Sequence, residues 1–109
     1  MSIPERHVYV AVRRDIPLAH QAVQAVHAGI SAARELIPDS IAHLNLVLCT
    51  VPDQSALLGL LARCNAAGVQ TRVFVESDMD NQPTALASEP VDGARRRLFR
   101  DLPLFNGET

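Results

Sequence analysis

An alternating strand pattern followed directly by a long helical pattern is the feature that most limits how this chain can fold. In residues 7–13, valines alternate with Tyr9 and Ala11, as in a β-strand. From Pro17 to Ile37 the apolar residues follow the helical period, so we expect a helix there. Open α/β sheets usually bind ligands where a strand ends and its connection begins. The turn Arg13-Arg14-Asp15 is therefore expected at a functional edge of a sheet.

The predicted helix has two unlike sides. Asp15 is expected to cap it, with Pro17 in its first turn. The apolar side is expected to face the core and consists of Leu18, Ala22, Ala25, Val26, Gly29, Ala33, Leu36 and Ile37. The polar side forms a narrow seam of His20, Gln24, His27, Ser31 and Arg34. Two imidazoles and an amide therefore share one side of the predicted helix.

Further strands and helices alternate along the rest of the chain. Strands are expected at 43–50, 69–76 and 84–88, and helices at 53–68, with Asp53 as N-cap, and at 94–100. Alternation of this kind is typical of an α/β fold with a sheet covered on both faces. We expect one domain over 1–109, with a largely parallel sheet covered on both faces.

Composition excludes several classes of protein. The net charge is −2, and all ten basic residues are Arg, so the chain as a whole is unlike a basic nucleic-acid-binding domain. The cluster Arg95-Arg96-Arg97 with Arg100 is either a solvated surface or a local contact for an anion or RNA. No apolar run reaches 18 residues and no leader is recognised, so a cytoplasmic protein without a membrane partner is expected. Cys49 and Cys64 lie in apolar runs and are expected to be buried free thiols.

Two groups of polar residues could carry chemistry. His20 and His27 lie about 10 Å apart along a helix that rises ~1.5 Å per residue, too far to share a zinc ion, so no metal site and no cofactor are expected. Each histidine is either functional or an ordinary surface or structural residue. The acidic segment 76–80 is either a solvated loop or the source of a carboxylate that orients a water. Thr84 is either a plain strand residue or the hydroxyl that completes this site.

Four stretches of the sequence resemble the type II peptidyl-tRNA hydrolase family. Residues 9–16, Tyr-Val-Ala-Val-Arg-Arg-Asp-Ile, resemble its first strand and its Arg-x-Asp-Leu turn. Residues 22–28, Ala-Val-Gln-Ala-Val-His-Ala, resemble its Ala-Ala-Gln-x-x-His-Ala helix. Residues 47–69 match its second half-unit, and residues 84–90 resemble its Thr-x-Leu-Ala-x-x-Pro strand. Together the four stretches span almost the whole chain.

The resemblance implies a three-layer α/β/α structure with a four-stranded mixed, mostly parallel sheet, and hydrolysis of the ester that joins a peptide to tRNA. The family's site is built around a Lys in the first helix turn, an Asp after the third strand and nearby Thr residues. In this chain His20 stands in place of that Lys, and Leu18 in place of a second one. The family's Asp-Ala-Gly-x-Thr-Gln loop is replaced by residues 77–82, whereas Thr84 is kept.

Carried onto this chain, the resemblance predicts two sets of site residues. His20 is expected as base or electrophile, Glu76 or Asp78 as the group that orients it or the water, and Thr84 as a hydrogen-bond donor to the carbonyl. The full sets are, for catalysis, His20, His27, Glu76, Asp78 and Thr84 and, for substrate binding, Arg13, Asp15, Gln24 and Arg96. The expected partner is peptidyl-tRNA or another acyl carrier. An acyl-transfer enzyme acting on a carrier-bound thioester, a catalytically silent binding domain and a homodimer stay open.

Overall fold

The computed structural model describes residues 6–41 and 43–107, and its elements follow the expected order. The four strands are β1 (His7–Arg13), β2 (Asn45–Val51), β3 (Thr71–Glu76) and β4 (Gln82–Ser88). The two α-helices are α1 (Leu18–Glu35) and α2 (Gln54–Ala66). Two 3-10 helices, η1 (Ser77–Met79) and η2 (Gly93–Phe99), follow β3 and β4. The basic segment expected as an α-helix over 94–100 is therefore the 3-10 helix η2.

The four strands form one mixed sheet in the order β2-β1-β4-β3. β1, β2 and β3 share one direction, while β4 lies between β1 and β3 and runs opposite to both. Among the described strands only β1 and β2 therefore pair in parallel. The reversal after β3 is made by Asp80 (φ 54°) and Asn81 (φ 58°), residue types that tolerate the left-handed backbone of a tight turn. The α/β class and the mixed four-stranded sheet are confirmed, whereas the expectation of mostly parallel pairing is wrong, because β4 pairs antiparallel with both β1 and β3.

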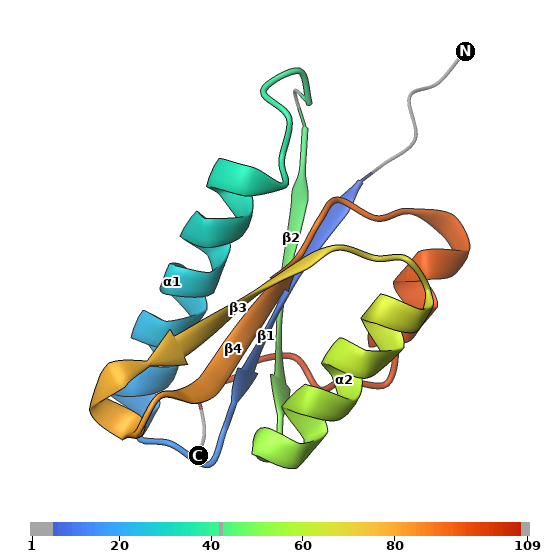
Figure 1. Ribbon diagram of the computed structural model, residues 1–109. Coiled ribbons are helices and arrows are strands. Elements are labelled where there is room, and N and C mark those ends of the chain that lie inside the picture. Colours follow the sequence, from blue (N-terminus) through green and yellow to red (C-terminus); the bar gives the residue numbers. More distant parts are fainter. Residues whose placement is uncertain (1–5, 42, 108–109) are drawn as a thin grey trace.

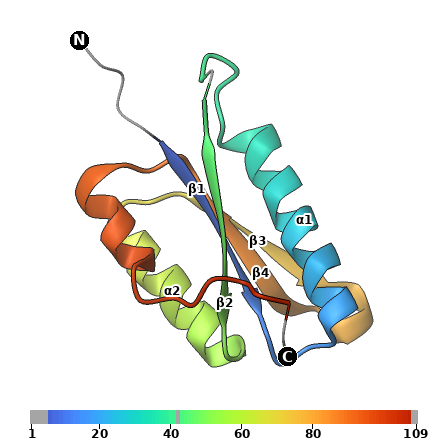
Figure 2. The same ribbon diagram turned by 180° about the vertical axis from the view of Figure 1, so that it is seen from behind.

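Helices cover both faces of this sheet (Figures 1 and 2). On the α1 side, the valines of β1 pack against the alanines of α1 and β4: Val8, Val10, Val12, Ala25, Ala28, Ala32, Ala85 and Ala87. On the side of α2 and η2, Tyr9 and Ala11 join a larger cluster that includes Leu57, Leu60, Leu86 and Phe99. Both alternating sets of β1 are thus buried, as expected for a central strand. None of the described helices has the length and hydropathy needed to cross a membrane.

The buried side of α1 is not the apolar side that the pattern predicts. Its buried residues are Gln21, Gln24, Ala25, Ala28 and Ala32, whereas Val26 is 60% exposed. Small alanines let the helix lie close to the sheet, and both glutamine amides find partners there. The Gln21 amide, for example, donates to the backbone carbonyls of Ile16 (2.8 Å) and Arg14 (3.3 Å). The Gln21 amide oxygen has no hydrogen-bond partner within the described residues, so this buried side chain is satisfied through its nitrogen alone.

The two α-helices begin differently from one another. Asp53 is the N-cap of α2, as predicted, and its carboxylate accepts the Ala56 N–H at 2.9 Å. Asp15 does not cap α1; the N-cap position is Pro17, with no side-chain hydrogen bond. Asp15 instead pairs with Arg13. A strong cation two residues away competes successfully for the carboxylate that was expected to cap the helix.

Both cysteines are buried free thiols, as predicted. Burial raises the pKa of Cys49 to about 12, because the thiolate would lose its solvation. Burial also raises the pKa of Cys64 to about 11, although the charge of Arg63 opposes the shift. Both side chains are therefore neutral and unreactive near pH 7.

Candidate functional site

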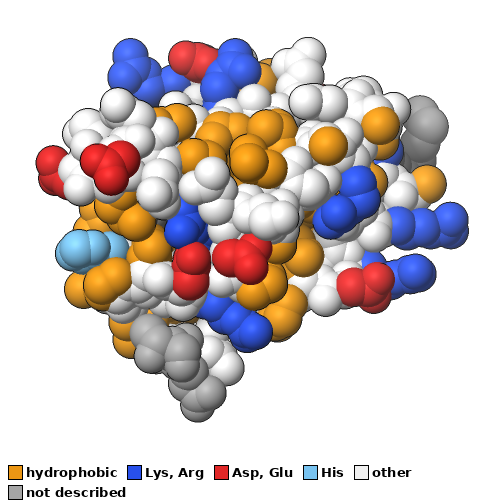
Figure 3. All heavy atoms as spheres, turned by 60° about the horizontal axis from the view of Figure 1, so that its bottom comes forward, with side chains coloured by type: hydrophobic (Ala, Val, Ile, Leu, Met, Phe, Trp, Pro, Cys, Tyr) orange, Lys and Arg blue, Asp and Glu red, His pale blue; other side chains and the backbone are white. Residues whose placement is uncertain are grey.

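The ends of β1, β2 and β3 lie together at one edge of the sheet, which we call the carboxyl edge. The first turn of α1 and the β3–β4 connection also lie there (Figure 1, lower part). Figure 3 brings this edge forward and shows acidic, basic and histidine side chains gathered among apolar ones. The topology thus places the predicted turn at Asp15 and the acidic segment after β3 at the same edge.

Three of the predicted site residues are joined by hydrogen bonds. The Gln24 amide nitrogen donates to the Glu76 carboxylate at 2.7 Å. The Thr84 hydroxyl donates to the Gln24 amide oxygen at 3.2 Å, with the Phe74 carbonyl as a second acceptor at 3.4 Å. Thr84 is fully buried and Gln24 is 3% exposed. A carboxylate can only accept hydrogen bonds, so the Gln24 amide nitrogen must face Glu76. The amide oxygen therefore faces Thr84, and the direction of both hydrogen bonds is fixed.

A β-bulge brings Thr84 into this network. Phe74 of β3 pairs with Ala85, but the next residue, Val75, pairs with Pro83, so Thr84 is an extra residue in β4. Simple alternation would place Thr84 on the α2 face with Leu86, and the bulge turns it toward α1 instead. Pro83 is the one sequence signal for this irregularity, since proline within a sheet is confined to edges and bulges.

Glu76 is held as an anion at the end of β3. Its other carboxylate oxygen accepts the Asp78 N–H at 3.2 Å. The hydrogen bond from Gln24, helped by that from Asp78 and by the nearby charges of His27 and His20, holds the pKa of Glu76 below its usual range; desolvation opposes this only in part. A half-buried carboxylate therefore stays ionised at neutral pH beside two imidazoles.

The two histidines of α1 have different surroundings. The His27 ring lies flat on Phe74, with centroids 4.4 Å apart and an interplanar angle of 3°. His20 is exposed in the first turn, and its imidazole makes no hydrogen bond within the described residues. Asp78 is also exposed, and only its backbone N–H joins the network. His20 is thus free to meet a solute, while His27 is fixed against β3.

Arg13 is the centre of a second network at the carboxyl edge and is only 7% exposed. Its guanidinium forms two bonds of 2.9 Å with the Asp15 carboxylate. The remaining amino group donates to Gln82 (3.0 Å), the Pro83 carbonyl (3.2 Å) and Gln54 (3.4 Å). Every nitrogen of this predicted substrate-binding residue is therefore engaged within the protein. The neighbouring Arg14 is exposed and has no side-chain partner within the described residues.

The pairing of Asp15 with Arg13 predicts a stability loss in acid. The hydrogen bonds from Arg13 hold the pKa of Asp15 below its usual range. Because the folded state favours the ionised form, the stabilisation is complete above the ordinary Asp pKa of about 3.9 and disappears as the pH falls toward the folded-state value. Asp15→Asn should flatten this part of a plot of unfolding free energy against pH, measured by urea denaturation. The exposed Asp39→Asn is the control; an equal flattening there would contradict the assignment.

A crevice of about 470 Å³ opens between the ends of β1 and β2. Its lining includes Arg14, Asp15 and the buried strand residue Thr50. The connection that follows β1 leads to α1 on one face, and the one that follows β2 leads to α2 on the other. Such a divergence of adjacent parallel strands is the usual ligand position in open α/β sheets, and the volume is that of a small-ligand site.

Arg96 is not part of either network. It belongs to η2 on the opposite face of the sheet, where its Nε donates to the Tyr9 hydroxyl at 3.0 Å. Gln21, Gln54 and Gln82 are the contributors to the edge that sequence reasoning did not select, because their partners are distant in the chain or backbone carbonyls. Among the described residues, no three His, Cys, Asp or Glu side chains are grouped as a metal ion would need.

Comparison with known proteins identifies a solved structure with a similar fold. No family model and no curated protein matches this sequence. The solved structure of a protein of unknown function from Agrobacterium tumefaciens strain C58 is similar, with a TM-score of 0.72 and 14% sequence identity. The match covers 95% of this chain and 100% of that one. At this identity the likeness shows the fold alone.

Proposed function

We propose that this protein is a peptidyl-tRNA hydrolase-like enzyme of the type II class, with that family's three-layer α/β/α arrangement, and that it hydrolyses an acyl ester in the cytoplasm. Peptidyl-tRNA is the reference substrate. The observation that carries the proposal is the Glu76 carboxylate at the carboxyl edge, which accepts the Gln24 amide at 2.7 Å and lies near the imidazoles of His20 and His27. A carboxylate beside an exposed imidazole is a common arrangement for general base catalysis.

In the proposed reaction His20 is the base. Its imidazole takes a proton from a water molecule, the resulting hydroxide attacks the ester carbonyl, and the carbon–oxygen bond to the carrier breaks. The imidazolium then returns the proton to the leaving alkoxide. Glu76 stabilises the transient imidazolium through its negative charge. Gln24, held by the buried Thr84, positions Glu76 and does not touch the substrate.

The crevice beside Asp15 is the proposed place for the carrier end of the substrate. Arg14 is an exposed cation there, and one guanidinium can bind a phosphate through two parallel hydrogen bonds. Neutralising only a few phosphates gives weak binding that falls steeply with salt. We therefore expect tRNA affinity to be modest and to be lost at moderate ionic strength.

A second candidate is a catalytically silent binding domain of the same fold. The net charge of −2 and the absence of Lys favour this alternative, because tRNA binding normally depends on many cations. The same charge balance also suits a smaller acyl carrier joined to its acyl group by a thioester. Release assays separate the three readings, since a silent domain binds without releasing product.

Glu76→Gln tests the proposal. The variant keeps an acceptor for Gln24 but loses the charge that stabilises the imidazolium, so turnover should fall on the order of 10²-fold with little change in melting temperature. The assay follows release of labelled peptide from peptidyl-tRNA, beside an acyl-carrier thioester. Asp39→Asn, an exposed residue without a side-chain partner in the described part of the chain, is the control. Binding without release by the wild-type protein would establish the silent domain, and full turnover by Glu76→Gln would remove the carboxylate from the mechanism.

A further inference from the structure

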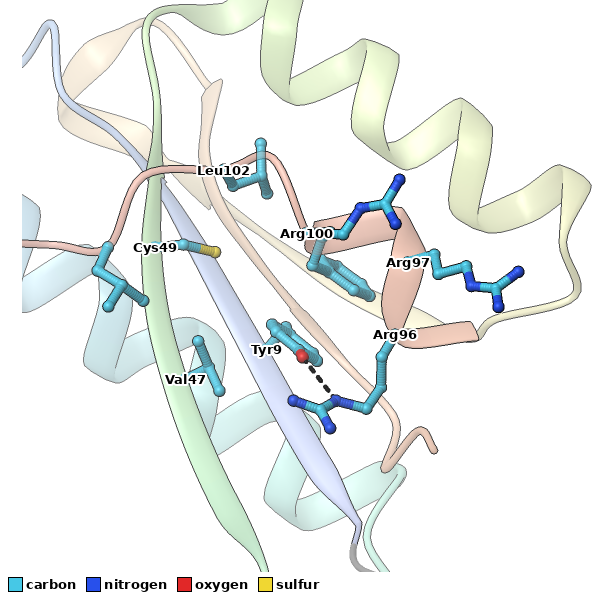
Figure 4. A pocket seen from close by; sticks show the side chains of 9 residues that line it. Tyr9, Val47, Cys49, Arg96, Arg97, Arg100 and Leu102 are labelled. Atoms are coloured by element: carbon cyan, nitrogen blue, oxygen red, sulfur yellow. Dashed lines mark hydrogen bonds between the residues drawn. The ribbon is translucent and has the colours of Figure 1, made fainter. Parts of the chain in front are cut away.

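A separate hollow of about 380 Å³ lies on the opposite face of the sheet from Glu76, and we call it the Tyr9 hollow (Figure 4). It is enclosed by β1, β2, η2 and the segment that follows η2. Its lining includes Tyr9, Val47, Cys49, Arg96 and Leu104. Apart from Leu104, which also lines the crevice beside Asp15, none of these residues takes part in the proposed ester hydrolysis.

The floor of the Tyr9 hollow is apolar and uncharged. The buried rings of Tyr9 and Phe99 stack in parallel, with centroids 4.3 Å apart and an interplanar angle of 4°. The Cys49 thiol donates to the Val10 carbonyl at 3.4 Å and stays protonated. Leu104 lies at the mouth and is exposed, although its backbone forms a bridge with Cys49. An apolar chain laid along this floor would cover Leu104, because the charged groups of the lining, Arg96, Arg97 and Arg100, all come from η2 and its C-cap at one side.

Arg96 places an oriented cation at one side of the hollow. Its Nε donates to the Tyr9 hydroxyl, and Figure 4 shows the side chain extending from η2 across to that ring. Within the described residues, its two terminal amino groups have no hydrogen-bond partner. A guanidinium held by Nε presents these two groups as a fork that matches a carboxylate.

Nearby acidic residues do not neutralise this cation. Glu89 pairs with Arg95, and Asp92 pairs with Arg6. In the part of the chain that the structure describes, neither Arg96 nor Arg97 forms an ion pair. The hollow therefore combines an unpaired positive charge with an apolar, neutral floor.

We propose that the Tyr9 hollow binds a small amphipathic carboxylate, an acid with a short apolar chain. Its carboxylate would pair with Arg96, and its chain would lie over Cys49 and Val47 toward Leu104. The volume falls within the range of small-ligand sites, and a few placed polar groups in an apolar lining are typical of them.

Tyr9 itself supplies the readout, because it is the single tyrosine and the chain has no tryptophan. Titration with octanoate should change the tyrosine fluorescence saturably, whereas octanol, which has the same chain without the charge, should not. Arg96→Gln should weaken octanoate binding by about tenfold or more, as expected for loss of a charge-assisted bidentate contact. Arg34→Gln, the same change at an exposed arginine of α1 whose side chain has no partner within the described residues, should leave the affinity within about twofold.

Calorimetry provides a second measure of octanoate affinity. It is needed because Arg96→Gln also removes the hydrogen bond to Tyr9, the residue whose fluorescence reports binding. Arg96→Lys, which keeps the charge and loses the fork, should bind with intermediate affinity and replaces Arg96→Gln if that variant melts early. Equal binding of octanol and octanoate, no saturable signal, or equal weakening by Arg34→Gln would each overturn the proposal. Tighter binding of octyl phosphate than of octanoate would also overturn it, because the ligand class would then be a phosphate.

Discussion

Arg13→Met should lower the free energy of unfolding by about 2–4 kcal/mol and the melting temperature by on the order of 10 °C. The substitution keeps an apolar stem of similar length but removes every donor that Asp15, Gln82 and the Pro83 carbonyl share. Acceptors left without a donor at a poorly solvated site lose more than the hydrogen bond was worth. The loss stays below that of a fully buried pair because the Asp15 side chain is 38% exposed.

The effect should be confined to the buried member of the Arg13-Arg14 pair. Arg14→Met makes the same chemical change at the adjacent, exposed residue, and its unfolding free energy should stay within about 0.5 kcal/mol of wild type. Urea denaturation of both variants gives the comparison. Equal losses would show that net charge, and not the Arg13 network, stabilises the carboxyl edge.

Local patterns predicted the elements of this fold well. The alternation of valines gives β1 its observed bounds of His7–Arg13, and Asp53 caps α2 as its position before an apolar stripe indicates. The chain reverses between β3 and β4 at Asp80 and Asn81, residue types that tolerate positive φ. Each of these features depends on residues within a few positions of one another, where sequence rules are strongest.

Features that depend on distant partners were not predictable in the same way. Gln24 looked like a surface residue of α1, but Glu76 and Thr84, which come 52 and 60 residues later, satisfy its amide inside the protein. The pattern therefore indicated the wrong side of α1 as the buried one. Asp15 looked like a helix cap, and only the fold shows that Arg13 is buried and needs its carboxylate.

The candidate site also combines features that local residues predicted with features that depend on distant partners. Reasoning from strand ends placed Asp15 and the acidic segment after β3 at one edge, and the topology agrees. The contact between Gln24, Glu76 and Thr84 then requires the bulge in β4, for which Pro83 is the only local sign. The dipeptide Arg13-Arg14 likewise gives no sign that Arg13 is buried and Arg14 exposed.

His20→Ala should reduce ester turnover by roughly 10²–10⁴-fold while leaving the melting temperature unchanged, because general bases contribute that much to rate. The His20 side chain is exposed and makes no hydrogen bond within the described residues, so its removal costs the fold little. His27→Ala should instead destabilise the protein by about 1 kcal/mol, the usual worth of a stacked aromatic pair. The lost contact is the parallel stack of His27 on Phe74.

Both variants should be measured by thermal unfolding and by release of peptide from peptidyl-tRNA, with His43→Ala as the matched control. His43 is exposed and precedes β2, at the end of the strand opposite the carboxyl edge, and its variant should match wild type in both measurements. Together the two measurements separate a chemical role from a structural one. Loss of His20 should lower turnover at an unchanged melting temperature, whereas loss of His27 should lower the melting temperature. Intact turnover in His20→Ala, with abolished turnover in a folded His27→Ala, would reverse the two roles and make His27 the base.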